Sequence, residues 1–119
     1  MTIKQFQRNH ALRVMNWCKV NVGLNYRRHT LPLLEWHSKG EDCGDYDFED
    51  NIISIYKNQH TSVIEIIATI IHEWVHYRQS TKKYYELDEK FGYAGNPLEH
   101  EADKIALDLK YKCRRDLFY

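Results

Sequence analysis

The chain is 119 residues long and 43% hydrophobic, which is typical of a single globular domain, so we treat residues 1–119 as one domain. Lys and Arg number 17, as do Asp and Glu, and a chain of zero net charge lacks the basic surface of a nucleic-acid-binding protein. No signal-type leader follows Met1 and no run of about 20 apolar residues predicts a membrane span. We therefore expect a cytoplasmic protein, monomeric or weakly oligomeric, that binds neither nucleic acid nor a membrane.

The first half of the chain predicts one helix and two or three strands. Apolar residues recur at helical spacing over residues 3–22. Residues 26–36 are typical of a strand, and Pro32 makes it an edge or irregular strand. Residues 38–51 are rich in Gly, Asp and Glu and predict a loop or hairpin end. Residues 51–56 predict the best strand of the chain because they are rich in β-branched side chains.

A strongly apolar helix is predicted next. Ser62 stands three residues before Glu65, and the two side chains can satisfy each other's backbone N–H groups as a capping box. The helix is expected to begin near Val63 and to run to about Gln79. Its isoleucines occupy more than one side of the helix, so we expect it to be buried nearly all round and to form the core of the domain.

The last third of the chain predicts a connection and a second long helix. Residues 80–96 are polar, contain Gly92 and Gly95, and predict a long connection. A final helix follows Asn96-Pro97, with apolar residues at helical spacing. The order of elements is helix, strands, buried helix, connection and helix, which places the chain in the α+β class.

The three cysteines are Cys18, Cys43 and Cys113, an odd number without a C-x-x-C pair. They therefore predict neither a disulfide framework nor a cysteine-type zinc knuckle. Cys18 and Cys113 fall on the apolar faces of the first and last predicted helices, and we expect both to be buried thiols.

A metal-binding pattern lies in the predicted buried helix, where His72-Glu73-Trp74-Val75-His76 fits H-E-x-x-H. Residues four apart share a helix face, so both imidazoles can reach one metal ion. Histidine nitrogens are ligands of Zn²⁺, and a catalytic zinc site keeps one position open for water. The glutamate is offset by about 100° around the helix, so it can take a proton from the metal-bound water without binding the metal.

A third metal ligand is expected from the last helix, whose first turns contain Glu99, His100, Glu101 and Asp103. Glu99 and Asp103 lie four apart on one face, beside the apolar stripe. Glu99 can therefore bind the metal while Asp103 accepts the far N–H of a ligating histidine. Glu101, on the opposite flank of the stripe, ranks second as the ligand. His100 points further from the apolar face and ranks third.

These residues resemble the gluzincin group of zinc metallopeptidases. The pattern of that family is H-E-x-x-H followed by a glutamate ligand in E-x-x-[SA]-D on the next helix. Residues 69–76 and Glu99-x-x-Ala102-Asp103 carry the resemblance, which covers roughly residues 50–112. Small uncharacterised bacterial and phage proteins of the metallopeptidase type share it.

The resemblance implies a minimal zincin-like fold with an N-terminal helix, a small, twisted, mostly antiparallel sheet, a buried active-site helix and a C-terminal helix that carries the third ligand. It implies one zinc ion bound by His72, His76 and Glu99, with Glu73 as general base and acid. Asp103 is implied as the residue that orients a histidine. The implied activity is that of a metalloendopeptidase-like hydrolase acting on a protein or peptide substrate.

Two further features of the family have candidates in this chain. Larger members carry a His or Tyr that stabilises the tetrahedral oxyanion, and Tyr84, Tyr85 and Tyr93 can serve here, with nothing in the sequence to select among them. The family also implies a strand that lies antiparallel to bound substrate at the edge of the cleft. The candidate is the strand at residues 51–56, to which an extended peptide can add by backbone hydrogen bonds.

Two alternative hypotheses belong to other classes of protein. In a deformylase-like site, a cysteine upstream of H-E-x-x-H is the third ligand, and Cys43 has that position, although Asp42 and Gly44 do not match the E-G-C-L-S of that family. In a non-enzymatic protein, the same fold is a zinc-bound regulatory or protein-interaction module without turnover. Replacing Cys43 with Ser would remove zinc from the deformylase-like site but not from the peptidase site. The non-enzymatic module would bind a protein partner and cleave no peptide.

Overall fold

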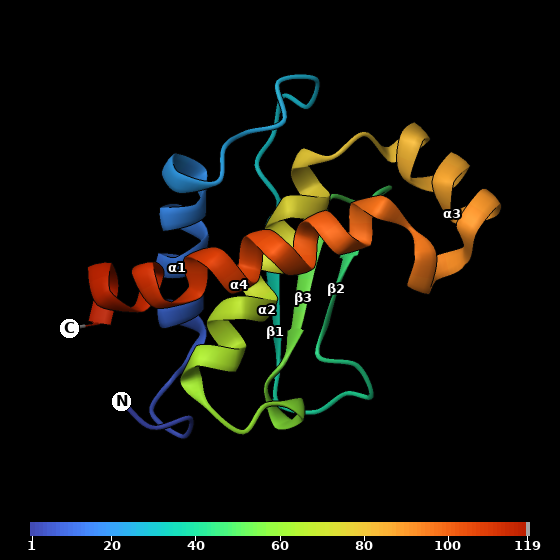
Figure 1. Ribbon diagram of the computed structural model, residues 1–119. Helices are drawn as coiled ribbons and strands as arrows, with labels where there is room; N and C mark the ends of the chain where they lie inside the picture. The colour runs from blue at the N-terminus through green and yellow to red at the C-terminus, as the bar shows by residue number, and fades with distance from the viewer. Residues whose placement is uncertain (119) are drawn as a thin grey trace.

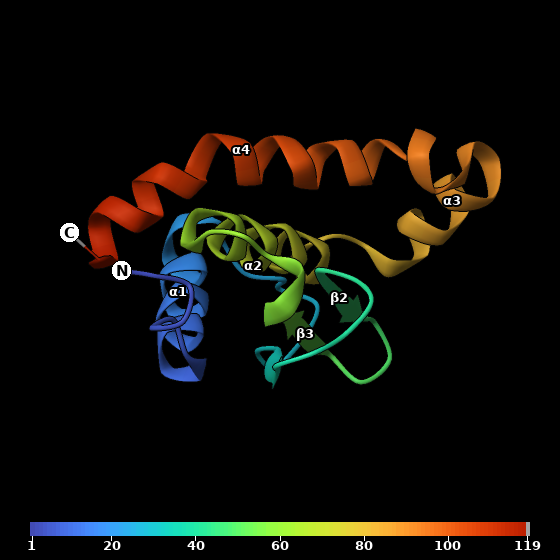
Figure 2. The ribbon, with the colours of Figure 1, turned by 90° about the horizontal axis from the view of Figure 1, so that it is seen from below.

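The computed structural model describes residues 1–118 and arranges the helices and strands in layers (Figure 1). Along the chain they are α1 (Arg8–Asn21), β1 (Leu33–His37), β2 (Gly44–Asp47), β3 (Ile52–Tyr56), the short 3-10 helix η1 (Lys57–Gln59), α2 (Val63–Arg78), α3 (Thr81–Gly95) and α4 (Pro97–Phe118). Figure 2 shows α4, α2 and the sheet stacked in that order, with α1 at one end and α3 at the other. The prediction of the α+β class is confirmed.

The helix α2 is the centre of the core because apolar side chains cover most of its circumference. It packs against α1, α4, β2 and β3, and Ile66, Ile67, Ile70 and Ile71 are fully buried. Half of the predicted capping box is present at its N-terminus, where the hydroxyl of Ser62 accepts the N–H of Glu65. The carboxylate of Glu65 accepts the N–H of Thr61 at 2.8 Å. Its bounds agree with the predicted helix to within one residue.

The sheet has the order β1-β3-β2, with β1 parallel and β2 antiparallel to β3. The expectation of a mostly antiparallel sheet is therefore wrong, because one of its two pairings is parallel. The parallel pair is β1 and β3, because β2 comes between them in the chain, inside the segment 38–51 that is predicted as a loop or hairpin end. β2 forms the hairpin with β3, so β3 enters the sheet between two strands that precede it in the chain.

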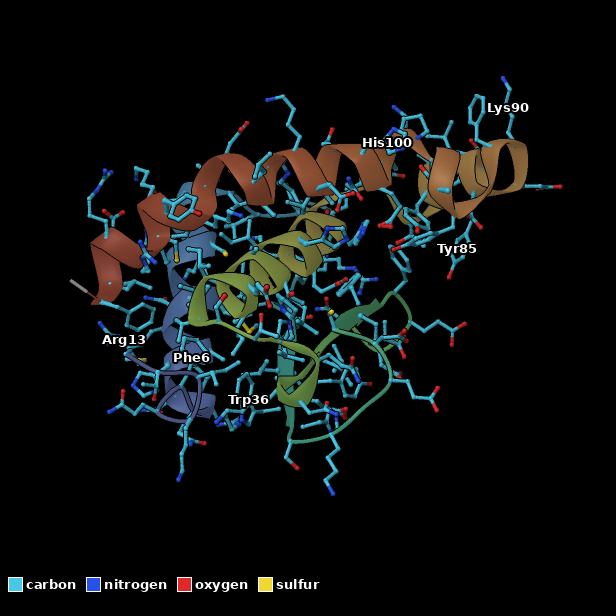
Figure 3. The ribbon with its side chains drawn as sticks, turned by 60° about the horizontal axis from the view of Figure 1, so that its bottom comes forward. Phe6, Arg13, Trp36, Tyr85, Lys90 and His100 are labelled. Atoms are coloured by element: carbon cyan, nitrogen blue, oxygen red, sulfur yellow. The ribbon has the colours of Figure 1, made fainter. Side chains whose placement is uncertain are left out.

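Two other predicted elements are shorter in the structure. The strand predicted at residues 26–36 begins only at Leu33, directly after Pro32, whose missing N–H cannot join a ladder. The helix predicted from residue 3 begins at Arg8, because the preceding residues form a turn that buries Phe6. Its ring packs near Trp36 of β1, with ring centroids 5.9 Å apart (Figure 3).

The connection predicted at residues 80–96 is mostly the helix α3. The hydroxyl of Ser80 caps it by accepting the N–H of Lys83, and Gly92 kinks it with a φ of 73°. None of its residues is buried, and its polar composition and two glycines are typical of a loop, which is why the sequence predicts a connection there. Figures 1 and 2 show α3 at the end of the molecule, next to the start of α4.

Two predictions about the whole chain agree with the structure. Among residues 1–118, no helix is long enough and apolar enough to cross a membrane. Cys18 and Cys113 are buried free thiols, as expected, while Cys43 is an exposed free thiol. Burial raises the pKa of Cys113 to about 12, which makes this thiol unreactive at neutral pH.

The close approach of β2 to α2 gives a first prediction. A Cβ on Gly44 would lie 2.8 Å from Cγ2 of Thr69 and 2.9 Å from the carbonyl oxygen of Ser54. We expect Gly44→Ala to lower the free energy of unfolding by about 1–3 kcal/mol, measured by urea denaturation. The double variant with Thr69→Ser, which keeps the hydroxyl but removes Cγ2, should recover part of that loss. Equal stability of Gly44→Ala and the wild type would contradict the packing described here.

Candidate metal centre

Two imidazoles and one carboxylate meet between α2 and α4. His72 and His76 are one turn apart on α2, and Glu99 lies in the first turn of α4, which packs on α2. The Nε2 atoms of the two histidines are 3.1 Å apart. Oε1 of Glu99 is 3.2 Å from Nε2 of His72 and 2.6 Å from Nε2 of His76. Ligand atoms at 2.0–2.1 Å from a tetrahedral zinc ion lie about 3.3 Å apart, so this triangle has nearly the size that such an ion requires.

Hydrogen bonds on the far side of each imidazole determine which ring nitrogen carries the proton. Nδ1 of His72 is 2.9 Å from Oδ1 of Asp103, and Nδ1 of His76 is 2.8 Å from Oε1 of Gln79. Both partners are acceptors, because Asp103 is a carboxylate and Gln79 uses its Nε2 to donate to the carbonyl of Leu98. The two Nδ1 atoms are therefore the donors, and in a neutral ring each Nε2 presents a lone pair to the centre.

Glu99 adds a third acceptor atom to the centre. Burial acts to raise the pKa of its carboxyl, but the hydrogen bonds and charges of His72 and His76 lower that pKa to about 2. Burial acts to lower the pKa of His72, and the contact with Glu99 together with neighbouring carboxylates raises it overall. Three acceptor atoms this close repel one another unless a cation or a proton lies among them. The donor set and its spacing therefore fit a divalent metal ion that accepts nitrogen and oxygen ligands.

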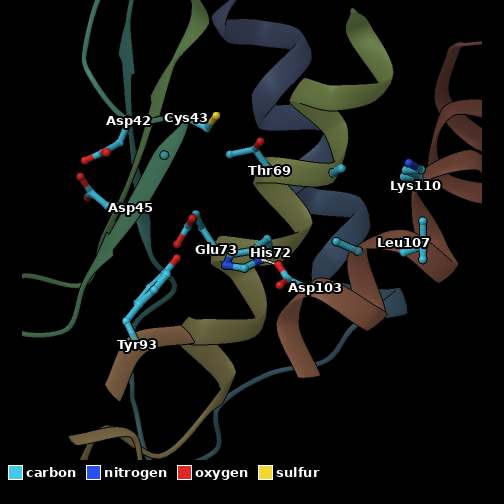
Figure 4. Close-up of a pocket in the computed structure, with 13 residues that line it drawn as sticks. Asp42, Cys43, Asp45, Thr69, His72, Glu73, Tyr93, Asp103, Leu107 and Lys110 are labelled. Atoms are coloured by element: carbon cyan, nitrogen blue, oxygen red, sulfur yellow. Dashed lines mark ion pairs between the residues drawn. The ribbon is translucent and has the colours of Figure 1, made fainter. Parts of the chain in front are cut away.

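Glu73 lies beside this triangle and faces the groove between β2 and α4 (Figure 4). A carboxylate oxygen of Glu73 and one nitrogen from each of His72 and His76 lie within 4.8 Å of one another. Oε1 of Glu99 lies within 3.2 Å of Nε2 of both imidazoles, which makes Glu99 the candidate for the third ligand. Glu73 is only 7% exposed, and burial raises its pKa to about 7 against the opposing attraction of the two histidines.

The three candidate tyrosines have different surroundings. The hydroxyl of Tyr84 donates to Oε2 of Glu99 at 3.2 Å, so it steadies the ligand carboxylate. Tyr85 is 57% exposed and lines neither of the two cavities at the centre. Tyr93 lines both cavities, and Figure 4 shows its hydroxyl directed toward the carboxylate of Glu73. Burial and the charges of Glu99 and Glu73 raise the pKa of Tyr93, so its hydroxyl is a proton donor at neutral pH.

The other residues considered as ligands lie outside the triangle. Oε1 of Glu101 accepts from Nε2 of Gln79 at 3.2 Å and is 3.5 Å from the guanidinium of Arg78. His100 is exposed, and its ring contacts a backbone carbonyl of α3. Cys43 is exposed on the wall of the groove, and in the part of the chain that the structure describes it belongs to no group of metal-capable side chains.

The expected strand for substrate binding is wrong. Residues 51–56 contain β3, which lies between β1 and β2. Both of its edges are therefore occupied, and a central strand has no free backbone groups for an added peptide. The strand that borders the centre is β2, whose Gly44 and Asp45 line the groove together with His72 and Glu73.

The outer edge of β2 is open to an added strand. The carbonyl of Cys43 accepts the N–H of Tyr56, so these two residues are a hydrogen-bonded pair of the antiparallel ladder. Such pairs alternate along the strand, and the N–H and C=O groups of Gly44 and Tyr46 consequently point away from β3. Gly44 has no side chain and that of Tyr46 is buried, so neither covers these backbone groups.

Gln79 is the residue of the centre that reasoning from the sequence misses. It is three residues after His76 and seven after His72, so the helical spacing places it on the same face, and that spacing is the signal in the sequence. Its role depends on tertiary structure, because its amide is oriented by the carbonyl of Leu98 on another helix. Gln79 is also the C-terminal cap of α2, where the backbone leaves the helical conformation.

No protein-family model, curated protein or solved structure matches this chain. The nature of the centre is therefore argued from its own geometry: two nitrogens and one oxygen that converge on a point, and two acceptors that fix the tautomers of the rings. A buried carboxylate next to that point completes the set of groups that faces the groove.

This geometry predicts which side chains determine metal affinity. We expect the purified protein to bind one equivalent of zinc, and Glu99→Gln to lower its affinity by at least about 100-fold, measured by competition with a chromogenic chelator. Glu101→Gln is the matched control and should bind zinc like the wild type. Gln79→Leu leaves the ligands intact and removes only an outer acceptor, so the expected loss is about 10- to 100-fold. Equal zinc affinity of Glu99→Gln and Glu101→Gln would exclude the proposed triangle.

Proposed function

We propose that this protein is a zinc-dependent peptidase whose metal is bound by His72, His76 and Glu99. The observation that carries the proposal is the convergence of three lone-pair donors beside the buried carboxylate of Glu73. A purely structural zinc site has no need of a further carboxylate that is buried beside the ligands and faces an open groove. Such a carboxylate suits proton transfer to a reacting group.

Peptide hydrolysis divides its chemistry between the metal and the chain. A zinc ion bound at the centre supplies Lewis-acid polarisation of the substrate carbonyl. Glu73 accepts a proton from the attacking water, whose oxygen bonds to the carbonyl carbon. It then delivers a proton to the leaving nitrogen as the C–N bond breaks, so the products are a carboxylic acid and an amine. The surroundings of Glu73 favour this double role because no residue in the range 1–118 occupies its carboxylate with a hydrogen bond.

A peptide is the substrate class that the surroundings of the centre favour. The outward N–H and C=O groups of Gly44 and Tyr46 can pair with an extended peptide that adds antiparallel to β2. The groove next to this edge has a volume of about 740 Å³, enough for several residues of such a peptide. Backbone pairing aligns the scissile bond with the centre, whatever the side chains of the substrate are.

Tyr93 is the tyrosine best placed to stabilise the developing oxyanion. Its hydroxyl faces the groove near Glu73, while the hydroxyl of Tyr84 is engaged with Glu99. The kink at Gly92 brings this last turn of α3 toward the groove. A neutral phenol can donate a hydrogen bond to the oxygen on which charge develops.

Glu73→Gln separates catalysis from metal binding. We expect this variant to bind one zinc ion, to unfold at the same temperature as the wild type and to cleave peptides at least about 100-fold more slowly. Cleavage is measured with a mixture of peptides of random sequence and mass spectrometry. A wild-type protein that binds zinc but cleaves no peptide would favour the regulatory or protein-interaction module over the enzyme.

The role of the tyrosine hydroxyl is tested by Tyr93→Phe, with Tyr85→Phe as the matched control. Loss of one donor to the oxyanion lowers kcat by about 100-fold, so we expect this effect for Tyr93→Phe with KM and zinc affinity nearly unchanged. Tyr85→Phe should leave kcat unchanged because this side chain does not line the groove. A loss of zinc from Tyr93→Phe would instead assign the residue a structural role.

A further inference from the structure

The groove beside the metal centre extends well beyond the groups that act on the scissile bond. It lies between the β2 end of the sheet and α4, and its floor is the part of α2 that contains Ala68 and Thr69, one turn before His72 and Glu73. Because the side chains of Ala68 and Thr69 are small, they leave space for a ligand above α2. The groove therefore leads from the centre toward the N-terminal half of α2 (Figure 4).

The wall formed by α4 has a regular composition. Asp103, Leu107 and Lys110 line the groove at intervals of four and three residues, which places them on one face of the helix (Figure 4). Asp103 marks the metal end because it contacts His72. Leu107 is 62% exposed and offers an apolar surface next to Ala106. Lys110 lies at the far end. Along the wall, the metal centre is therefore followed by the apolar side chain of Leu107 and then by the positive charge of Lys110.

Lys110 differs from the neighbouring lysines of α4. Lys104 pairs with Asp108 at 2.8 Å, and Lys112 pairs with Asp116 at 3.3 Å. Lys110 is half-buried, and within residues 1–118 it has no carboxylate partner; its Nζ lies 5.2 Å from the ring centroid of Tyr111. A half-buried cation without a counter-charge, on the wall of a groove, favours binding of an anionic group from outside.

The distance from the centre to Lys110 corresponds to a short peptide. Lys110 lies seven positions after Asp103, which is about 10 Å along α4. An extended peptide advances about 3.3 Å per residue, so about three residues cover this distance.

The direction of the peptide follows from β2. The start of β2, with Gly44, borders the groove, while Tyr46 lies further along α2, near Tyr77. A peptide that adds antiparallel to β2 therefore has its C-terminal part in the groove.

We propose that the groove binds the three residues on the C-terminal side of the cleaved bond and that Lys110 pairs with a carboxylate at the third of them. The carboxylate comes from an acidic side chain or from the C-terminus of the substrate. The first or second residue places an apolar side chain on Leu107. This inference rests on the proposed peptidase function and adds to it a preference for substrates of this charge and polarity.

The acidic groups of the opposite wall are compatible with this preference. Asp45 lies on β2 next to Gly44 and points to the face opposite α2, where its Oδ2 accepts a hydrogen bond from the hydroxyl of Tyr56. Figure 4 shows the carboxylates of Asp42 and Asp45 directed away from His72, at the outer side of the groove. These negative charges repel a substrate carboxylate at other positions of the groove. They therefore favour the one position of the peptide at which its carboxylate meets Lys110.

Zinc-binding probes test the proposal without requiring turnover. A malonyl hydroxamate, whose CH2–CO unit replaces the first residue, is joined to one of three dipeptides: Leu-Glu amide, Leu-Gln amide or Leu-Gln with a free carboxyl end. The dissociation constant of each probe from the zinc-loaded protein is measured by calorimetry. We expect at least one carboxylate probe to bind about fivefold more tightly than the neutral amide, and the tighter of the two identifies the source of the charge.

Two lysine variants make the test specific. Lys110→Glu should reverse the preference, so that the neutral amide binds more tightly than the carboxylate probes. Lys104→Glu changes charge at the same helix without lining the groove, and should keep the wild-type preference. Equal affinity of the wild type for all three probes overturns the role of Lys110 and leaves the peptidase proposal intact. If the zinc-loaded protein binds none of them, the peptidase site and the inference both fail.

Discussion

Repulsion among three acceptor atoms is the constraint on which the centre depends. Packing of α4 on α2 brings Oε1 of Glu99 to the Nε2 atoms of His72 and His76. The outer partners of the two rings favour a proton on Nδ1, so that Nε2 of a neutral ring is an acceptor. Without a cation or a proton among the three atoms, the contact between the helices brings like partial charges together; with one, the same contact is stabilising. Binding of the proposed metal would therefore be linked to the docking of α4.

The two histidines of the centre lie on α2, the most tightly packed helix, while β2 and α3 surround the centre and contribute less to the core. α2 is held from several sides by apolar packing, so its polar face keeps a defined orientation. β2 contributes Tyr46 to the core, and it supplies an open backbone edge at the rim. α3 contains no buried residue, yet the hydroxyl of Tyr84 donates to the carboxylate of Glu99 and Tyr93 reaches the groove. Its position over the centre, rather than its contribution to the core, connects it to function.

Zero net charge conceals a division of charge around the groove. Acidic side chains lie near the metal centre and along the β2 wall, and Lys110 lies at the far end of the α4 wall. In a cavity bordered by protein, such local charges act on a ligand more strongly than the net charge of the chain does. In the proposed peptidase, recognition of substrate and attraction of the metal would therefore be separate effects of different side chains, although one helix, α4, carries both Glu99 and Lys110.

Local spacing was enough to predict much of the fold and of the centre. The buried helix and the last helix were found because each buries one or more faces, and a buried face leaves a period of about 3.6 residues in the sequence. In any helix, residues four apart lie on the same face. This rule selected the two histidines of α2 and the pair Glu99 and Asp103 of α4, and the structure brings these residues together.

The tertiary structure alone decided the rest. β2, with the sequence Gly-Asp-Tyr-Asp, has no strand propensity and exists because it pairs with β3. α3 buries nothing, and the sheet is mixed because of a crossover that no local pattern records. The amide of Gln79 reaches the carbonyl of Leu98, and Tyr93 reaches the groove, only when segments distant in sequence pack together. Periodicity records which face of an element is buried; it carries no information about the partner against which that face is packed.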